Sequence, residues 1–264
     1  MIPALLGMAI GAVMGLTGAG GGILAVPALV FALGWPLADA APVALVAVSG
    51  AAALGAIEGL KRGLVRYRAA ALMAAIGVPF TPLGVWLASV APENALLLTF
   101  AAAMALVSVR MLRELHSAGL GVRPDRLPVN IDPSTGRVRW TRRTALALGL
   151  IGAAAGFLSG LLGVGGGFLI VPALRRFSDI TMQGVVATSL AVIALVSAGA
   201  VVAASLHAHP PAWDVAAPFA LGAAAGMIVG RLGARHLEAA HLQRAFAIVT
   251  AVVALGLLVR VVLG

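Results

Sequence analysis

A glycine-rich segment occurs twice in the chain, and this repeat constrains the fold more than any other feature. The first copy, at residues 15–22, reads GLTGAGGG, and the second, at residues 160–167, reads GLLGVGGG. The offset of 145 residues holds over a longer stretch, because the VPAL sequence at 26–29 returns at 171–174. Two copies of a glycine-broken apolar segment are typical of transporters built from two repeats, with the substrate bound at the breaks.

The composition indicates that the chain lies in a membrane. It is 61% hydrophobic and only 10% charged, whereas soluble domains have about 25% charged residues. Apolar stretches near the length that crosses a bilayer, about 20 residues, fill most of the chain. We therefore predict an all-α polytopic integral membrane protein with ten apolar segments, at residues 3–17, 22–34, 40–60, 69–90, 94–113, 143–161, 166–177, 183–206, 214–234 and 240–262.

Two of these segments, 22–34 and 166–177, are too short for a comfortable crossing. Each is joined to its predecessor only by the glycine run, so we expect each pair to form a helical hairpin with the glycines at its tip. Irregular backbone at membrane depth is tolerated only against protein or a water-filled cavity. The tips are therefore expected to lie inside the protein.

The basic residues predict the orientation. Of the 18 Lys and Arg residues, 17 fall in or beside four regions, at 61–68, 110–143, 175–176 and 231–244. Cytoplasmic loops carry an excess of Lys and Arg, so we expect these regions to be cytoplasmic and both termini to be outside. No basic residue precedes Lys61, which argues against a signal peptide and for a retained N-terminal segment. We expect a multi-pass protein of a bacterial-type cytoplasmic (inner) membrane.

Together these features predict an inverted repeat. A hairpin that returns to its starting side, followed by three transmembrane helices, makes an odd number of crossings per half. The two repeats then have inverted topology, and the expected domains are residues 1–113, a cytoplasmic linker at 114–142 and residues 143–264. The turn-forming sequence DPSTG at 132–136 lies between two short apolar stretches, so we expect a small strand–turn–strand hairpin in the linker.

Other classes of function receive little support. The net charge of +9 follows the membrane loops, so we expect no nucleic acid partner. There is no cysteine, and the apolar segments contain almost no His, Asp or Glu. We therefore expect no metal, no cofactor and no enzymatic activity. The partners expected are the lipid bilayer and a small anionic substrate.

With both glycine motifs in place, the chain resembles the TauE/SafE family of membrane transporters, often labelled sulfite exporters. The resemblance covers almost the full length. It includes the glycine motifs with Pro27 and Pro172 downstream, the ATSL sequence at 187–190 and the KRGLVRYR loop at 61–68. Where the second half has Thr188 and Ser189, the first half has no hydroxyl pair. The resemblance implies export of sulfite, of sulfonates such as sulfoacetate, or of related small anions.

The glycine runs suit an anion. Glycine lets a ligand approach the backbone closely, and a helix N-terminus presents unpaired N–H groups and a positive dipole end. Two half-helix N-termini would bind an oxyanion near the midplane without a buried cation. The predicted substrate-binding residues are Thr17, Gly18, Gly20, Gly21, Gly22, Gly163, Gly165, Gly166, Gly167, Thr188 and Ser189.

Each of these residues has a structural alternative. A hydroxyl, including that of Ser49, often bonds to the carbonyl one turn back in a membrane helix. Glycines at 7, 11 and 15 have the spacing that lets helices pack closely.

Glu58 is the only acidic residue well inside an apolar segment. It either carries a coupling proton or pairs with Lys61 or Arg62.

The function predicted from the sequence is a secondary transporter that exports a small sulfur-containing oxyanion. Expelling an anion from a cell that is negative inside releases about 2.3 kcal/mol per charge per 100 mV, so export needs no coupled ion. An anion channel and an importer of a related anion are the alternatives.

Overall fold

The computed structural model describes residues 1–18, 21–117, 129, 140–206, 210–233 and 239–263. Apart from one isolated bridge at Val129, the regular structure of these residues is helical. The first part of the chain forms α1 (Ile2–Thr17), the 3-10 helix η1 (Gly21–Leu24), α2 (Ala25–Leu33), α3 (Leu37–Lys61), α4 (Tyr67–Val90) and α5 (Glu93–Ser117). The second part forms α6 (Arg142–Leu162), α7 (Gly167–Phe177), α8 (Met182–Leu206), α9 (Trp213–Gly233) and α10 (Ala239–Leu263).

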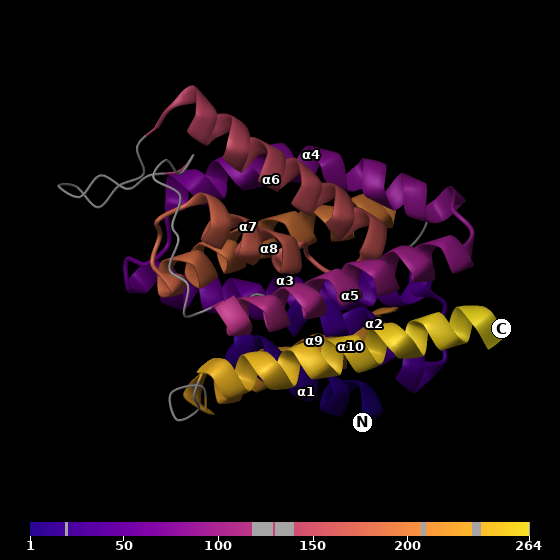
Figure 1. Ribbon diagram of the computed structural model, residues 1–264. Coiled ribbons are helices and arrows are strands. Elements are labelled where there is room, and N and C mark those ends of the chain that lie inside the picture. The colour runs from indigo at the N-terminus through magenta and orange to yellow at the C-terminus, as the bar shows by residue number, and fades with distance from the viewer. Residues whose placement is uncertain (19–20, 118–128, 130–139, 207–209, 234–238, 264) are drawn as a thin grey trace.

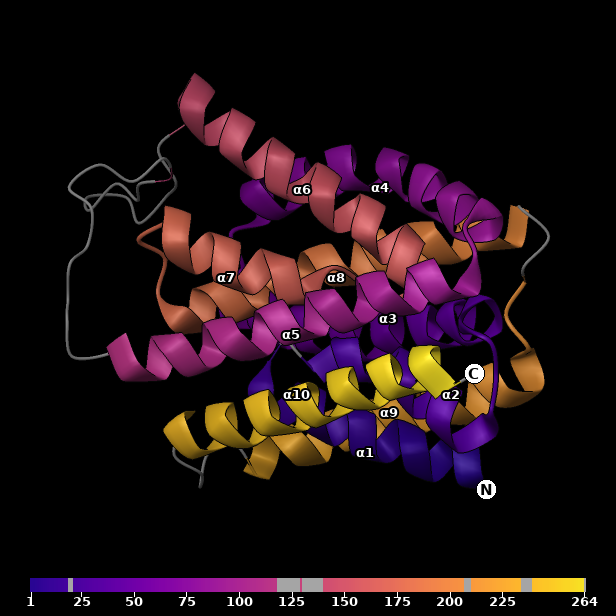
Figure 2. The same ribbon diagram turned by 45° about the vertical axis from the view of Figure 1, so that its right-hand side comes forward.

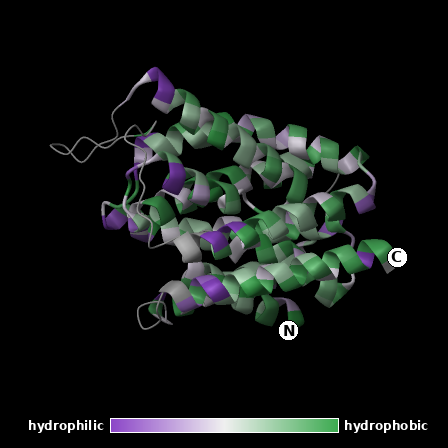
Figure 3. Cartoon of the chain, viewed as in Figure 1, coloured by the Kyte–Doolittle hydropathy of each residue, from purple (hydrophilic) through white to green (hydrophobic). Residues whose placement is uncertain are grey.

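The helices match a membrane protein in length and composition. Among the described residues, seven helices are long and apolar enough to cross a membrane, namely α3, α4, α5, α6, α8, α9 and α10. The helix α1 and the η1–α2 segment are apolar but shorter. Hydrophobic residues cover the middle of the bundle, and hydrophilic residues gather mainly at one end of it (Figure 3). The chain is an all-α polytopic membrane protein, as the sequence predicts.

The repeat extends from the glycine motifs to the helices. The two central helices, α3 and α8, each have 25 residues, and they begin and end 145 positions apart. Equivalent helices also pack on equivalent partners in the opposite half (Figures 1 and 2). The helix α1 packs on α9 as α6 packs on α4, while α3 packs on α8 and α5 packs on α10.

Equivalent helices of the two halves run antiparallel. Ser49 of α3 meets Ala194 of α8, and further along α3 Gly59 meets Ala187, so the residue numbers run in opposite order. The contacts between α5 and α10 follow the same rule. Repeats whose equivalent helices are antiparallel are inverted with respect to each other. The inverted-repeat architecture is therefore confirmed.

The centre of this pseudo-two-fold arrangement can be located. Ser49 and Ala194 are the middle residues of α3 and α8, and they occupy equivalent positions in the two repeats. The Ser49 hydroxyl donates a hydrogen bond to the Ala194 carbonyl oxygen at 3.0 Å. The central helices thus cross at their midpoints, and the pseudo-axis passes through this contact.

Glycines bring the backbones of neighbouring helices into direct contact. A Cβ atom added at Gly11 of α1 would overlap the carbonyl oxygen of Ala223 on α9. One added at Gly156 of α6 would overlap the carbonyl oxygen of Gly77 on α4. In a membrane, where lipid solvates apolar side chains as well as protein does, such close packing is a main source of helix association. The packing interpretation of the glycines at 7, 11 and 15 is confirmed.

Between the end of α5 at Ser117 and Trp140, the structure describes the central linker only at Val129. The Val129 N–H donates to the Phe177 carbonyl oxygen at 3.0 Å, and Val129 forms an isolated parallel bridge with Ser178 at the end of α7. The predicted turn at 132–136 lies outside the described residues. The domain boundaries at 113 and 143 stay predictions.

Both chain termini lie at one end of the bundle, and α5 ends at the other (Figure 2). We predict that single cysteines replacing Ile2 and Lys61 are labelled from opposite sides of a sealed membrane. The chain has no cysteine of its own, so only the introduced cysteine reacts with the label. A cysteine at Pro92, in the α4–α5 turn, should behave like the one at Ile2. Labelling of Ile2 and Lys61 variants from the same side would contradict the inverted topology.

The close helix packing predicts a contrast between two glycines. An added Cβ at Gly226 of α9 would overlap the Met8 carbonyl oxygen of α1, whereas one at Gly50 of α3 meets nothing within 4 Å. Gly226→Ala should therefore lower stability by about 1–3 kcal/mol, the usual cost of overpacking. Gly50→Ala should be neutral or slightly stabilising, because Ala favours a helix. Thermal unfolding in detergent measures both, and equal midpoints would refute the packing role.

Candidate functional site

The two glycine motifs meet in the middle of the protein. An added Cβ at Gly22 would lie 3.5 Å from the carbonyl oxygen of Val164, in the other motif. Gly165 lies against Val48 and Ile193, which occupy equivalent positions next to the midpoints of α3 and α8. The motifs therefore cross beside the pseudo-axis.

The breaks in the helices have a local cause. Gly18 follows α1 with φ of 81°, and its equivalent Gly163 follows α6 with φ of 72°. Gly166 precedes α7 with φ of 69°. These values lie in the left-handed region that side chains disfavour, so glycine at these positions allows the helix to stop and the chain to turn back. Gly20 lies outside the described residues.

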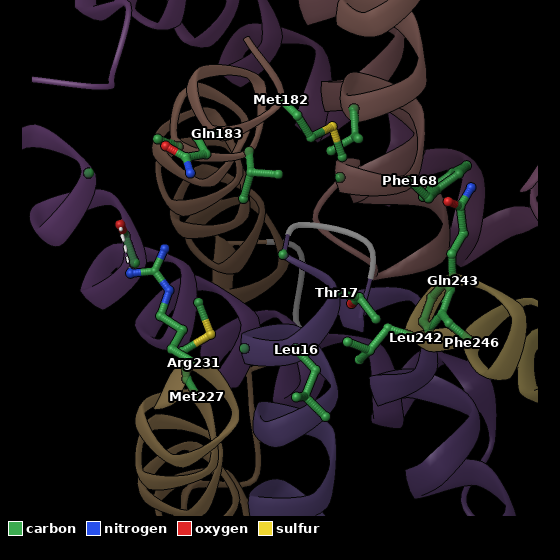
Figure 4. Close-up of a pocket in the computed structure, with 18 of the residues that line it drawn as sticks. Leu16, Thr17, Phe168, Met182, Gln183, Met227, Arg231, Leu242, Gln243 and Phe246 are labelled. Carbon is green, nitrogen blue, oxygen red and sulfur yellow. Dashed lines mark hydrogen bonds between the residues drawn. The ribbon is translucent and has the colours of Figure 1, made fainter. Parts of the chain in front are cut away.

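A cavity of about 700 Å³ extends from the glycine breaks toward the ends of the helices. Its walls come from seven helices of both halves, and Figure 4 shows the side chains that line it. Of the predicted site residues, Thr17, Gly18 and Gly167 line this cavity. The remaining lining is mostly apolar but includes five charged side chains, those of Glu58, Arg62, Arg110, Arg175 and Arg231.

The other predicted glycines that the structure describes lie behind the cavity wall. Gly21, Gly22, Gly163, Gly165 and Gly166 are buried and do not line the cavity. An added Cβ at Gly21 would lie 2.6 Å from the Met14 backbone nitrogen, and one at Gly166 would lie 2.7 Å from the Ala155 carbonyl oxygen. These two glycines let the arms of each hairpin approach closely, so substitutions there disturb packing first.

The predicted hydroxyl groups have different surroundings. The Thr17 hydroxyl donates to the Val13 carbonyl oxygen at 2.7 Å, one turn back in α1. Thr188 is fully buried on α8, and its hydroxyl oxygen accepts the Arg66 backbone N–H at 3.0 Å. Ser189 is fully buried, and its hydroxyl has no hydrogen-bond partner within the described part of the chain.

Ser197 is a candidate site residue that was not predicted from the sequence. This residue of α8 is fully buried, its hydroxyl has no partner among the described residues, and its Oγ lies 2.6 Å from the Cβ position of Gly165. Two helical turns separate it from Ser189, with Ile193 between them on the same face. That spacing was a signal available in the sequence. Buried hydroxyls without partners are costly, so Ser189 and Ser197 mark polar positions beside the second glycine motif.

Glu58 is paired with two arginines. Its Oε1 lies 2.5 Å from Nη2 of Arg62, one turn further along α3. Its Oε2 accepts a hydrogen bond from Nη1 of Arg231 on α9. The predicted pairing with Arg62 is confirmed. The partner on α9 was not predicted, because it lies 173 residues away in the chain.

Among the described residues, the part of the first hairpin that corresponds to the cavity wall is packed inside the protein. The residues of α7 that line the cavity include Phe168, Leu169 and Val171. The residues 145 positions earlier, Ile23, Leu24 and Val26, are no more than 5% exposed. In the part of the chain that the structure describes, the bundle is thus open beside the second hairpin and packed at the equivalent positions of the first.

A bundle of membrane-length helices with inverted repeats, and a cavity that ends at paired helix breaks, has the architecture of a membrane transporter. The family model for the sulfite exporter TauE/SafE family matches residues 3–257. The chain belongs to this family.

Two relatives support the same class. A protein of Xylella fastidiosa strain Temecula1, named a probable membrane transporter protein, is 31% identical over 250 residues, which cover 93% of this chain and 90% of the relative. Its counterpart from Xylella fastidiosa strain 9a5c carries the same name and matches with the same identity and coverage. No solved structure matches the chain. The protein is a multi-pass membrane transporter.

The contact between Thr188 and the loop after α3 gives a prediction. Thr188→Val removes the acceptor of the Arg66 N–H and should lower stability by about 1–3 kcal/mol, the cost of a buried group left unpaired. Thr188→Ser keeps the acceptor and should lower stability much less. Thermal unfolding of both variants is the measurement. A Val variant as stable as the Ser variant would show that this bond does not stabilise the loop.

Proposed function

We propose that the protein exports a small sulfur-containing oxyanion, such as sulfite or sulfoacetate, across the cytoplasmic membrane by alternating access. The observation that carries the proposal is the one-sided cavity, which begins at the basic end of the bundle and ends at the paired glycine breaks. A small anion fits a cavity of about 700 Å³ with several molecules of water.

The orientation follows from the basic residues. Arg62, Arg110, Arg175 and Arg231 all line the cavity, and the loops that contain or flank the first three carry most of the basic residues of the chain. Because such loops are retained in the cytoplasm, the cavity opens toward the cytoplasm and both termini lie outside. The positive charge of these four arginines also concentrates anions at the entrance of the cavity.

The closed end favours a carrier over a channel. A channel needs a continuous polar path, whereas the residues of the first half that correspond to the cavity wall on α7 are apolar and buried. In inverted repeats, exchanging the conformations of the two halves closes one end and opens the other. The state open to the outside would then expose Ile23, Leu24 and Val26 of the first hairpin.

The proposed binding residues lie on both sides of the crossing point. Thr17, Gly18 and Gly167 line the cavity directly, and α7 presents its N-terminus there, where unpaired N–H groups attract an oxyanion. Ser189 and Ser197 offer buried hydroxyls that bind the anion as it moves deeper. The proposed set is completed by glycines that shape the two breaks, namely Gly21, Gly22, Gly163, Gly165 and Gly166. Gly20 and Thr188 belong to it as predictions from the sequence.

The proposal is tested in sealed proteoliposomes that contain the purified full chain. Labelled sulfite, kept under anoxic conditions, and labelled sulfoacetate are the probes. We expect saturable flux that a membrane potential accelerates in the direction in which the anion leaves the negative side. Large unsaturable currents would indicate a channel, and accumulation of the anion against the potential would indicate a coupled importer.

Thr17 provides a matched pair of variants for this assay. Thr17→Val removes the only predicted hydroxyl that lines the cavity and should weaken the apparent affinity by about 0.5–1.5 kcal/mol, the usual contribution of one hydrogen bond. The control is Thr99→Val, because Thr99 makes the same bond one turn back but is exposed on the outside of α5. Equal losses in both variants would exclude a role for Thr17 in binding.

A further inference from the structure

We propose that Arg231 binds the anionic group of the substrate inside the cavity, and that Glu58 holds the Arg231 guanidinium when no substrate is bound. The inference rests on the proposed anion transport and names a recognition residue of that same site. Glu58 is then a carboxylate of the protein itself that competes with the substrate for the Arg231 guanidinium.

Arg231 lies close to the first glycine break. Its backbone nitrogen lies 2.8 Å from the Cβ position of Gly15, two residues before the end of α1. Its side chain is 25% exposed and lines the cavity. In the view of Figure 4, Arg231 and Gln183 lie on one side of Thr17, and Phe168 and Gln243 lie on the other. Arg231 and Thr17 line the same cavity, so an anion that enters it can meet both side chains.

Among the described side chains, the charges in contact with Arg231 do not balance. Glu58 is bound by Arg62 and by Arg231, one through each carboxylate oxygen, so the three side chains carry a formal charge of +1. Much of the neighbouring wall is apolar, including Leu54, Met227 and Ile228. A charge held against such a wall is unfavourable unless an opposite charge is near. A monoanion supplies that charge.

The guanidinium is placed to change partners. Both hydrogen bonds described for Arg231 leave from Nη1, one to Glu58 and one, at 3.4 Å, to the Gly55 carbonyl oxygen. A guanidinium has further N–H donors arranged as a planar fork, which matches the oxygens of a sulfonate or sulfite. An added Cβ at Gly55 would lie 3.4 Å from Nη2, so the backbone of α3 runs directly beside the guanidinium.

The pair exists at only one end of the protein. In the inverted repeat, the position equivalent to Glu58 is Ala203. The position equivalent to Arg231 is Val85, because Arg231 lies against Gly15 as Val85 lies against Gly160. Ala203 packs with Val85 and Ala204 in a separate apolar cluster. The anion therefore meets a guanidinium when the cavity is open at the basic end, and it meets no equivalent pair when the opposite end opens.

A simpler role for the same contacts makes a different prediction. If Glu58 only fastens α3 to α9, removing its charge loosens the structure and weakens binding or leaves it unchanged. If Glu58 competes with the substrate, removing its charge strengthens binding. The sign of the change in affinity separates the two roles.

The experiment uses the purified full chain in detergent, with sulfite and sulfoacetate as probes in titration calorimetry. Glu58→Gln should lower the Kd about tenfold, and in proteoliposomes it should lower KM. Arg231→Gln should raise the Kd about tenfold or more. Asp39→Asn is the control, since it removes a carboxylate from the other end of α3, where it is exposed, and it should leave the Kd unchanged.

The inference is overturned if the wild-type protein binds these anions and Glu58→Gln binds them equally or more weakly. It is also overturned if Arg231→Gln binds like the wild type. If Glu58→Gln does not yield folded protein, Glu58→Asp, which keeps the charge and shortens its reach, should still lower the Kd, by a smaller factor. A wild-type protein that neither binds nor transports any of the anions would instead refute the proposed function.

Discussion

Direct contact between helix backbones is the constraint on which the rest of the structure depends. The helix α1 lies against α9, and α6 lies against α4, with glycines removing the side chains that would separate them. Each of these pairs joins the hairpin of one repeat to a crossing helix of the other. Because lipid gives little hydrophobic reason for helices to associate, this packing fixes the depth of each hairpin. The glycine breaks consequently meet beside the midpoint of the central helices.

Most of this architecture could be predicted from the sequence because the repeat is nearly free of gaps. One offset relates the glycine motifs and also the bounds of α3 and α8. The odd number of crossings then required inversion. The helix ends were less predictable. The sequence predicts one apolar segment over residues 22–34, but the structure has a 3-10 turn at Gly21–Leu24 and begins α2 at Ala25. The contact of Gly21 with the backbone of α1 tightens this turn, and nothing in the local sequence reports that contact.

The candidate site was predictable only where the residues concerned are close together in the sequence. The position of Thr17 next to the break follows from the chain itself, and so does the pair formed by Glu58 and Arg62, which are one turn apart. Arg231 and Ser197 were missed because their significance depends on residues from other helices. In a sequence, a single arginine near a helix end is evidence only about membrane topology. The packing of α9 on α3 and α1 is what brings Arg231 to the cavity. Likewise, a serine in an apolar helix gains importance only when its hydroxyl is buried without a partner.

The two repeats share a backbone plan but differ in charge, and this difference gives the proposed transporter its sidedness. Matching helices allow two conformations of similar energy that open at opposite ends. The cavity arginines and Glu58 are confined to the basic end, and at the other end Ala203 belongs to an apolar cluster. Such an asymmetry cannot set the direction of net transport, because that depends on the electrochemical gradient of the anion. It does set where the anion is held most firmly, since electrostatic attraction acts on the side where the positive groups lie. In a cell that is negative inside, the potential keeps the cytoplasmic concentration of a freely exchanging anion low. In the proposed orientation the cavity arginines face the cytoplasm, so they raise occupancy of the site where the anion is scarce, and the end without them favours release where the anion is abundant.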